Sequence, residues 1–301
     1  MRRLFAVLAI FSITFAVAQQ DPQYSQYMFN KLAFNPAVAG SNDAICLGLL
    51  YRSQWVDFEG APTTGVFNVD APIGQTFAIG ASVMFDEIGF DQTLEAKLAL
   101  AARPRIGSGR LGIGVSLGFM QKTLDGDWRF NDPNDPLIPL NSESASVFPD
   151  IGAGLYYYTN KLFIGASASH LSEAEIEYDN ITSTTARHYF GLIGYTFDLS
   201  PSWGLAPSVL VKSDEAETQV DINARAIYNN RFWGGVSYRL EDAIVAMIGF
   251  NISDFRLGYS YDFTTSEIND YSNGTHEITL GYCFNIKRTP TYYMNRNVRF
   301  L

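Results

Sequence analysis

The sequence predicts an all-β fold: a transmembrane antiparallel β-barrel of about 14 strands, with the N-terminal segment at the periplasmic mouth. Three observations lead to this prediction. From about residue 44 onward, runs of residues alternate apolar with small or polar side chains, which is typical of strands with two different faces. The number of runs is even, and the links between them differ in length as they do in outer-membrane barrels. No long amphipathic helix pattern is found in the sequence.

The first 18 residues have the parts of a secretory signal peptide. Arg2 and Arg3 precede an apolar run from Leu4 to Val17, and Ala16 and Ala18 are the small residues expected at a cleavage site. No cysteine follows that site directly, so a lipoprotein anchor is not expected. No later stretch has the roughly 18 apolar residues of a membrane helix. We therefore expect Sec export, with residues 1–18 removed.

Residues 19–43 form an N-terminal segment that does not alternate, and its core reads "DPQYSQYMFNKLAFNPAVAGS". It places Tyr24, Tyr27 and Phe29 among amide side chains and then breaks at Asn35 and Pro36. Such a segment is too apolar to remain in water and too irregular to be a strand. Two interpretations stay open: it plugs the barrel at the periplasmic mouth, or it is a docking surface for periplasmic secretion components.

Residues 44–288 are expected to form the barrel, and residues 289–301 a C-terminal tail of unknown role. The clearest strand runs from Phe255 to Phe263, where aromatic and leucine side chains share one face. Pro207 lies inside another run and is expected to mark a bulge, because proline cannot donate to a ladder. The runs are centred near Leu49, Phe67, Ala81, Leu98, Val115, Leu155, Ala166, Ile193, Val209, Ala224, Val236, Val245, Tyr259 and Tyr282.

Short and long links take turns along the chain, which predicts short periplasmic turns and long extracellular loops. The tight links are 73–76, 106–109, 159–160, 199–202, 229–230 and 252–254, and the longest links are 121–150, 171–184 and 264–275. Acidic groups in 125–128 and 131–136 are read as a solvated loop, because their spacing matches no standard calcium loop.

Charged residues fall on the face of the strands opposite the apolar one, so the apolar face is assigned to lipid and the charged face to the lumen. Six charges of each sign predict a paired interior lattice, because an unpaired charge in a confined interior is costly. Glycines on the lumen face leave room for something to enter: Gly112, Gly114, Gly165 and Gly258. The predicted lattice comprises Arg52, Asp70, Asp86, Glu95, Lys97, Arg103, Asp221, Arg225, Arg239, Arg256, Asp262 and Glu277. The alternative is one or two secreted β-sandwiches, whose strands also alternate.

The two cysteines, Cys46 and Cys283, lie in the first and last predicted strands, which barrel closure makes neighbours. One interpretation is a disulfide across this seam, which export would allow to persist. The other, which we favour from the sequence, is a pair of free thiols, because the register is unknown and a bridge needs Cα atoms within about 7 Å.

Composition and motifs argue against two classes of function. Without Arg2 and Arg3, 19 of the 21 basic residues remain against 31 acidic ones, a balance that opposes nucleic-acid binding. The histidines are His170, His188 and His276, on different links or strand ends, and no GxSxG, HExxH or CxxC pattern accompanies them. We expect no enzyme, no cofactor and no metal site.

Three stretches carry a family resemblance: "DPQYSQYMFNKLAFNPAVAGS" (21–41), "YRSQWVDFEGAPTT" (51–64) and "NDPNDPLIP" (131–139). With these motifs the chain resembles the PorP/SprF family of outer-membrane proteins associated with type IX secretion and gliding motility. The resemblance implies an outer-membrane barrel that works with type IX secretion components and has no catalytic activity. It also implies that large surface adhesins, each with a C-terminal signal domain, are exported and held at the surface. A passive outer-membrane porin or solute channel is the alternative function.

In "YRSQW", Arg52 has lumen parity, and Gln54 and Trp55 follow where the chain leaves the membrane. A cation near an aromatic rim suits a loop or a partner's carboxylate. The competing interpretation is structural: Arg52 pairs with a lumen acid, and Trp55 belongs to an interfacial aromatic belt. Together with Tyr24, Tyr27, Phe29, Asn35 and Pro36, these three residues are the predicted partner-binding or plug residues.

Overall fold

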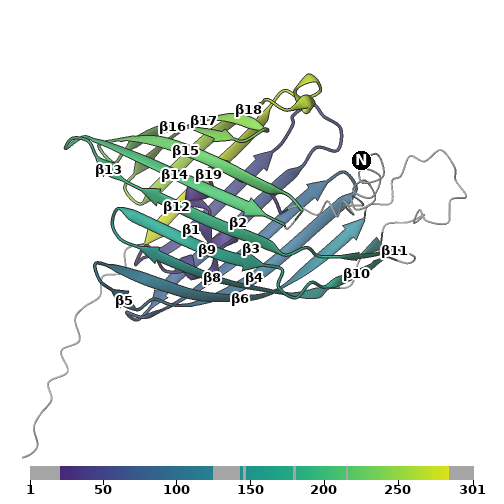
Figure 1. Cartoon of the computed structure of the whole chain (residues 1–301), viewed down its shortest axis with the longest axis horizontal. Coiled ribbons are helices and arrows are strands. Elements are labelled where there is room, and N and C mark those ends of the chain that lie inside the picture. Colours follow the sequence, from purple (N-terminus) through teal and green to yellow (C-terminus); the bar gives the residue numbers. More distant parts are fainter. Residues whose placement is uncertain (1–20, 125–142, 145–146, 179–180, 215, 285–301) are drawn as a thin grey trace, which may run out of the picture.

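In the computed structural model, the described residues are 21–124, 143–144, 147–178, 181–214 and 216–284. They form a closed antiparallel β-barrel of 14 long strands (Figure 1), which confirms the predicted fold class. No helix among them is long and apolar enough to span a membrane. The predicted signal peptide (1–18), the motif at 131–139, the acidic stretch at 125–128 and the tail (289–301) lie outside the described residues.

Each of the predicted runs is centred within one of the long barrel strands, as alternating side chains require. The first seven strands are β1 (Ile45–Ser53), β2 (Thr63–Ile73), β3 (Phe77–Ile88), β4 (Asp91–Ala102), β6 (Gly109–Leu124), β8 (Phe148–Tyr158) and β9 (Leu162–Ser169). The other seven are β12 (His188–Tyr195), β14 (Trp203–Ser213), β15 (Thr218–Tyr228), β16 (Phe232–Arg239), β17 (Ala243–Ile252), β18 (Phe255–Thr264) and β19 (Thr275–Phe284).

Short elements lie at the two rims of the barrel or inside it. The additional strands are β5 (Arg105–Ile106), β7 (Glu143–Ser144), β10 (Glu175–Tyr178), β11 (Ile181–Thr184) and β13 (Phe197–Asp198). The 3-10 turns are η1 (Tyr27–Phe29), η2 (Lys31–Ala33), η3 (Pro36–Val38) and η4 (Glu267–Asp270).

The barrel closes between its first and last long strands. β1 pairs with β19 in a continuous antiparallel register from Ile45↔Phe284 to Ser53↔His276. In this register Cys46 lies directly opposite Cys283, and a disulfide joins them with the Cα atoms 4.1 Å apart. The favoured sequence interpretation of two free thiols is therefore wrong. Closure of the barrel sets the register between β1 and β19, which the sequence alone did not reveal.

Pro207 does not produce the predicted bulge. The ladder of β14 with β12 runs to Gly194↔Ser208 and resumes with β13 at Phe197↔Leu205, with the same offset before and after the gap. On the other edge, Pro207 pairs in register with Ala224. The proline thus interrupts one ladder by lacking its N–H, and no extra residue is inserted.

The two ends of the barrel differ in the length of their links. One end, called here the long-loop end, carries the links 54–62, 125–147, 170–187 and 265–274, together with tight links at 89–90, 214–217 and 240–242. The other end, called the short-turn end, carries compact links such as 74–76, 159–161 and 253–254. The asymmetry is real, although three links at the long-loop end are as tight as those opposite.

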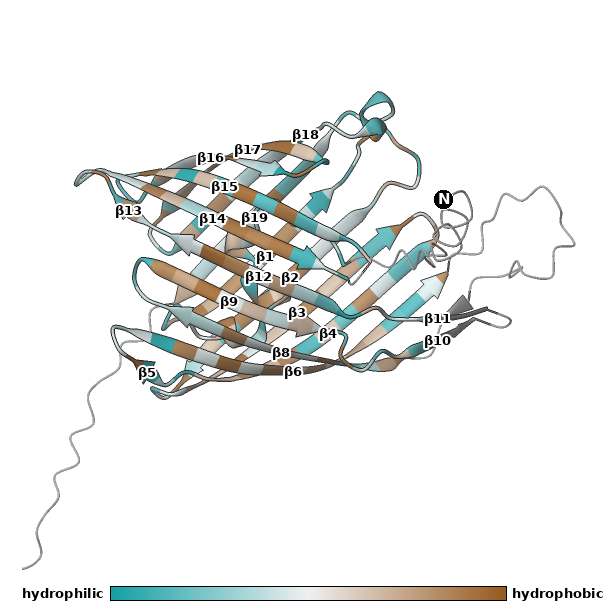
Figure 2. Cartoon of the chain, viewed as in Figure 1, coloured by the Kyte–Doolittle hydropathy of each residue, from teal (hydrophilic) through white to brown (hydrophobic). Residues whose placement is uncertain are grey.

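The outer surface of the barrel is apolar, as a lipid-facing surface must be. Figure 2 shows hydrophobic and hydrophilic residues alternating along the strands, and outward side chains such as Leu98, Leu117 and Ile248 are more than 60% exposed. Outward aromatic residues pair near the short-turn end, including Trp203 with Tyr228, whose ring centres are 4.8 Å apart. Aromatic residues at this level are typical of a membrane interface.

Candidate functional site: a lumen filled by the N-terminal segment

The described part of the N-terminal segment, residues 21–43, lies inside the barrel and runs along its lumen. Asp21 contacts the long-loop ends of β9, β12 and β14 through His170, His188 and Lys212. Gly40, near the other end of the segment, contacts Asp70 of β2. The segment therefore extends beyond the predicted periplasmic mouth, because polar partners that match it line the whole lumen.

A buried ionic network surrounds Ser25 in the long-loop half of the lumen. The Ser25 hydroxyl donates to both carboxylate oxygens of Asp262, at 2.9 and 2.7 Å. It accepts hydrogen bonds from Arg52 at 2.8 Å and Arg239 at 3.0 Å. Asp262 also pairs with both guanidinium groups, at 2.9 and 3.0 Å. These four residues are at most 1% exposed, so both guanidinium groups and the carboxylate that pairs with them are buried together inside the lumen.

Glu277 of β19 holds the backbone of the segment. Its two carboxylate oxygens accept the N–H groups of Ser25 at 2.8 Å and Gln26 at 2.7 Å. The Gln26 side chain continues the contact, since it donates to the Glu277 carbonyl and accepts from Thr279. A carboxylate that accepts two adjacent amides gives strong, charge-assisted hydrogen bonds. We call Ser25, Arg52, Asp221, Arg239, Asp262 and Glu277 the Ser25 network.

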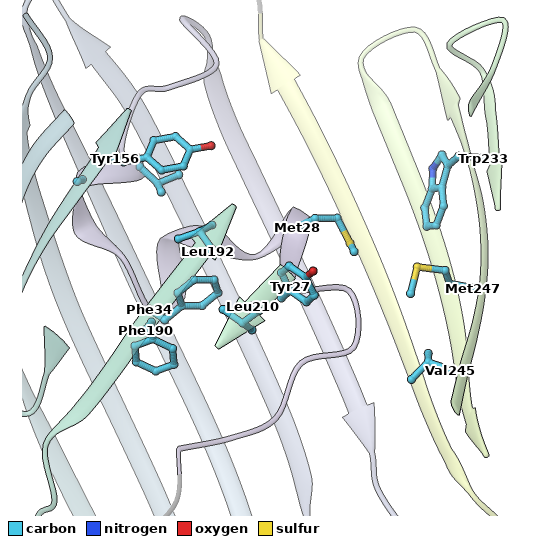
Figure 3. Close-up of a cluster of buried hydrophobic side chains, with 12 residues drawn as sticks. Tyr27, Met28, Phe34, Tyr156, Phe190, Leu192, Leu210, Trp233, Val245 and Met247 are labelled. Atoms are coloured by element: carbon cyan, nitrogen blue, oxygen red, sulfur yellow. The ribbon is translucent and has the colours of Figure 1, made fainter. Parts of the chain in front are cut away.

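Next to the Ser25 network, the N-terminal segment also contacts the barrel wall through apolar side chains. Figure 3 shows Tyr27, Met28 and Phe34 of the segment among side chains from the surrounding strands. Phe34 stacks on Phe190 with ring centres 5.1 Å apart, and the Tyr27 hydroxyl lies 2.8 Å from Ser208 Oγ. Burial of one such side chain is worth about 1.5–3 kcal/mol. The cluster comprises Tyr27, Met28, Phe34, Ala37, Val38, Tyr156, Phe190, Leu192, Leu210, Trp233, Val245 and Met247.

The lumen glycines make space for the segment itself. At Gly114, an added Cβ would come within 2.6 Å of Ala37 Cα, and at Gly154 it would overlap the amide of Asn35. Asn35 is fully buried, caps η3 by accepting the Ala37 N–H at 3.0 Å, and donates to the Leu155 carbonyl. Pro36 begins η3, where its missing N–H costs nothing.

A second set of contacts ties the start of the segment to the long-loop end. His170, just after β9, lies between two carboxylates: Nδ1 is 2.8 Å from Asp150 and Nε2 is 2.8 Å from Asp21. The backbone N–H of Asp21 donates to His188 Nε2 at 3.0 Å, and Lys212 donates to the Asp21 carbonyl at 2.9 Å. We call this arrangement the Asp21 latch.

The latch carries charge. Burial by itself lowers the pKa of His170, but the charge of Asp21 and hydrogen bonds to both carboxylates outweigh burial and raise the pKa from 6.5 to about 10. For Asp21, burial raises the pKa, but the charge of His170 and the hydrogen bond to it act in the opposite direction, and the pKa lies well below 3.8. The latch is therefore an imidazolium between two carboxylates at neutral pH.

The latch residues also have the chemistry of metal ligands. In the described part of the chain, two groups bring ligand atoms within 4.8 Å of one another: Asp21, His170 and His188, and Glu95, Asp150 and His170. His170 belongs to both groups, and both of its ring nitrogens are already engaged by carboxylates.

The residues of the predicted lattice all lie on the lumen face. Not every positive charge pairs with a negative charge of the lattice, as the prediction required. Arg239 pairs with Asp221 at 3.0 Å, and Lys97 pairs with Glu95. Asp86 accepts from Thr64, and Asp70 accepts from the Gly40 N–H. Arg103 contacts the Gly40 carbonyl and Asp43.

Arg225 and Arg256 instead stack on the Phe29 ring. Several lattice members thus bind the N-terminal segment itself.

The predicted plug residues fall into two groups. Tyr27, Phe29, Asn35, Pro36 and Arg52 come together inside the lumen, and Tyr24 packs beside them against Leu50, Val66 and Met84. Gln54 and Trp55 instead line a cavity of about 520 Å³ at the long-loop end, beside Asp21 and Gln23. Trp55 has φ of 45° and its backbone N–H donates to Thr275.

Sequence reasoning missed Ser25, Asp150 and the histidine pair. The signal for the pair was indirect: His170 directly follows β9 and His188 begins β12, so one loop separates the ends of two neighbouring strands. Their ring centres are 5.6 Å apart.

Residues 16–282 match the family described as type IX secretion system membrane protein PorP/SprF. The chain belongs to this family. The sequence resemblance seen in the N-terminal motifs is thereby confirmed, and the lumen described above is that of a PorP/SprF membrane protein. No curated protein matches the chain.

The PorP/SprF chain also resembles solved outer-membrane proteins in fold. The crystal structure of the Ralstonia pickettii toluene transporter TbuX has a TM-score of 0.52 at 12% identity, covering 85% of this chain and 93% of that chain. The Acinetobacter baumannii outer membrane protein Omp33 has a TM-score of 0.46 at 10% identity, covering 81% of this chain and 99% of that chain. The likeness to TbuX shows the fold alone, and fold and family together indicate an outer-membrane protein.

Proposed function

We propose that this PorP/SprF protein is a noncatalytic outer-membrane component of type IX secretion that supports export and surface retention of large adhesin-type cargo. The cargo carries a C-terminal signal domain, and gliding motility is the process it serves. Residues 1–18 direct export through Sec and are then removed, and the protein sits with long loops extracellular and short turns periplasmic. Family membership supports the secretion role, and the filled lumen supports the choice of a holder over a channel.

The observation that carries this proposal is the closed lumen. Ser25, Gln26 and Tyr27 are at most 1% exposed, and Glu277 and Arg52 clamp the segment from the barrel wall. A passive porin needs a continuous water-filled path. In this barrel the N-terminal segment fills the lumen, and the two ends of the barrel differ in their links. A filled, rigid barrel of this kind suits a holding role.

The chemistry of the latch supports a noncatalytic role. A general base must have a ring nitrogen free to take a proton from a nucleophile. Both nitrogens of His170 bind carboxylates, and His188 Nε2 accepts the Asp21 amide. This arrangement immobilises the segment and engages the ring nitrogens of both histidines in hydrogen bonds.

The test combines a pull-down with a conductance measurement on the full-length protein. Tagged protein recovered from intact outer membranes is expected to bring down a secreted protein through its C-terminal domain, and purified protein in planar bilayers is expected to be silent. Steady ion conductance together with no cargo in the pull-down would instead make the protein a passive channel.

A deletion separates the plug from the rest of the barrel. Removal of residues 21–41, with the signal peptide kept, is expected to create ion conductance in planar bilayers, because the lumen loses its filling. A synthetic peptide of residues 21–41 added to the deleted barrel should restore silence. Unchanged conductance and unchanged cargo recovery after the deletion would contradict a plug or docking role for the segment.

A further inference from the structure

The short-turn half of the lumen contains three cations that no carboxylate balances. Lys31 lies in η2, Arg225 in β15 and Arg256 in β18. Among the described residues, none of the three forms an ion pair with a carboxylate, and the two arginines lie against the same Phe29 ring. This differs from the long-loop half, where every arginine of the Ser25 network has an acidic partner. We call the three residues the cationic cluster.

Aromatic rings hold the cationic cluster in place. The guanidinium carbons of Arg225 and Arg256 lie 4.6 and 4.2 Å from the centre of the Phe29 ring. Lys31 Nζ lies 4.4 Å from the Phe163 ring centre and donates to the Tyr156 hydroxyl at 2.7 Å. Each cation–π contact is worth about 0.5–2 kcal/mol, less than the several kcal/mol that burial of a charge costs. The rings position the cations without neutralising them.

Three buried hydrogen-bond donors in the same region have no acceptor among the described residues. Nε of Arg225, Nε of Arg256 and the indole Nε1 of Trp233 are buried without an acceptor. The Trp233 ring is 4.9 Å from the Phe29 ring, so these donors share one region of the lumen. Guanidinium and indole groups donate only, so they cannot satisfy one another. Two buried acceptors, Asn223 Oδ1 and Asn251 Oδ1, also lack a partner, and Asn251 is opposite Arg256 in the β17–β18 ladder. A bound anion would supply acceptors to the arginine donors.

The two arginines of the cluster lie near the short-turn end. Arg256 is the second residue of β18, directly after the turn, and Arg225 lies near the end of β15. Phe29, Lys31 and both arginines are half-buried, whereas Gln26 and Tyr27, which precede Phe29 and Lys31 in the N-terminal segment, are fully buried. This gradient of burial favours approach of a ligand from the short-turn end.

The protein's own C-terminal residues have the wrong charge to balance the cluster. β19 ends at Phe284 at the short-turn end, and the following residues 285–301 contain Lys287, Arg288, Arg296 and Arg299 with no acidic side chain. The side chains of residues 285–301 therefore offer the cationic cluster no carboxylate.

We propose that the cationic cluster is a binding site for a carboxylate of a partner polypeptide that enters the lumen from the short-turn end. The carboxylate belongs either to the C-terminus of that polypeptide or to an aspartate or glutamate side chain. Two guanidinium groups on one aromatic ring present N–H edges that suit a carboxylate, and Lys31 adds a third charge. The inference goes beyond retention of cargo and depends only on the geometry of the lumen.

Peptide binding to the purified full-length protein tests this site. The probes are Gly-Ser decapeptides with a neutral fluorophore at the N-terminus: one with a free C-terminal carboxylate, one amidated, and one amidated with glutamates in its sequence. Fluorescence anisotropy should show binding of at least one carboxylate-bearing peptide about tenfold tighter than the amidated neutral peptide. The better of the two acidic peptides identifies the source of the carboxylate.

A matched pair of variants locates the effect. The double variant Arg225→Gln with Arg256→Gln should lose the preference for carboxylate, while Arg105→Gln with Arg231→Gln removes two exposed charges at the same end and should keep it. Heat-modified mobility on gels shows that each barrel is folded. Equal binding of all three peptides, or a preference that survives in the first variant or disappears in the second, would overturn the proposal.

Discussion

His170 Nε2 lies 2.8 Å from a carboxylate oxygen of Asp21, across 149 residues of sequence. This contact fixes the start of the N-terminal segment at the long-loop end, while Asp150 binds the other ring nitrogen. Because the charged imidazole has a carboxylate on each side, its pKa is raised to about 10. The contact of Asp21 with His170 is therefore an ion pair that depends on the proton of the imidazolium.

The first prediction is a loss of stability on the alkaline side. The folded pKa of His170 is raised from 6.5 to about 10, so its stabilising contribution is complete below about pH 6.5 and is lost as the pH rises through 10. The pKa of Asp21 is lowered, so its contribution is lost only in acid, below its ordinary value of 3.8. Urea unfolding of the wild-type protein and of His170→Gln should differ most near pH 6 and converge near pH 10.

Convergence is the informative outcome, because a purely steric effect of the substitution would not change with pH. If the two midpoint curves stay parallel from pH 6 to pH 10, His170 does not hold the segment as a cation. Conductance gives an independent reading: the wild-type barrel should begin to open toward pH 10 if the latch helps to keep the lumen filled.

The second prediction concerns Glu277. Glu277→Gln keeps the size of the side chain but removes the charge that accepts the Ser25 and Gln26 amides and pairs with Arg52 at 3.3 Å. A loss of about 3 kcal/mol in unfolding free energy is expected, since a buried guanidinium loses one of its partners. Glu267→Gln on an exposed loop is the matched control and should be neutral. Equal urea midpoints for the two variants would show that Glu277 does not anchor the segment.

The barrel was predictable from local sequence because each strand carries its own evidence. Phe255 and Phe263 share the lipid face with the residues between them at every second position, and this parity needs no knowledge of neighbouring strands. For the same reason Arg52 and Glu277 were assigned to the lumen. Gly114 was correctly expected to leave room inside the barrel, although the sequence did not show that the room is taken by Ala37.

The contacts that fill the lumen were not predictable, because they join positions far apart in the chain. Ser25 and Asp262 are separated by 237 residues, and nothing in "QYSQY" distinguishes a serine that contacts two arginines. The Cys46 to Cys283 disulfide depends on cross-strand register, which parity leaves undetermined. These contacts together determine how far the N-terminal segment reaches into the lumen. The sequence alone therefore supported only a placement of the segment at the periplasmic mouth.

The third prediction concerns the disulfide that joins β1 to β19. It closes a loop of 237 residues, so its removal should lower the unfolding free energy by about 2–4 kcal/mol. The double substitution Cys46→Ser with Cys283→Ser should match the wild-type protein treated with reductant. Alkylation of unfolded, unreduced protein followed by mass spectrometry gives a direct check: no added label is expected, and two labelled thiols would contradict the bond.

The fourth prediction uses the glycines that face the segment. A Cβ at Gly114 would lie 2.6 Å from Ala37 Cα, too close for backbone that η3 holds in place. Gly114→Leu should therefore displace the segment and produce ion conductance, although the substituted strand itself remains able to pair. Gly191→Leu is the matched control, because a Cβ there meets nothing within 4 Å. Since both variants add the same side chain to a barrel strand, conductance confined to Gly114→Leu assigns closure of the lumen to η3, and silence in both variants would show that residues 36–38 do not seal it.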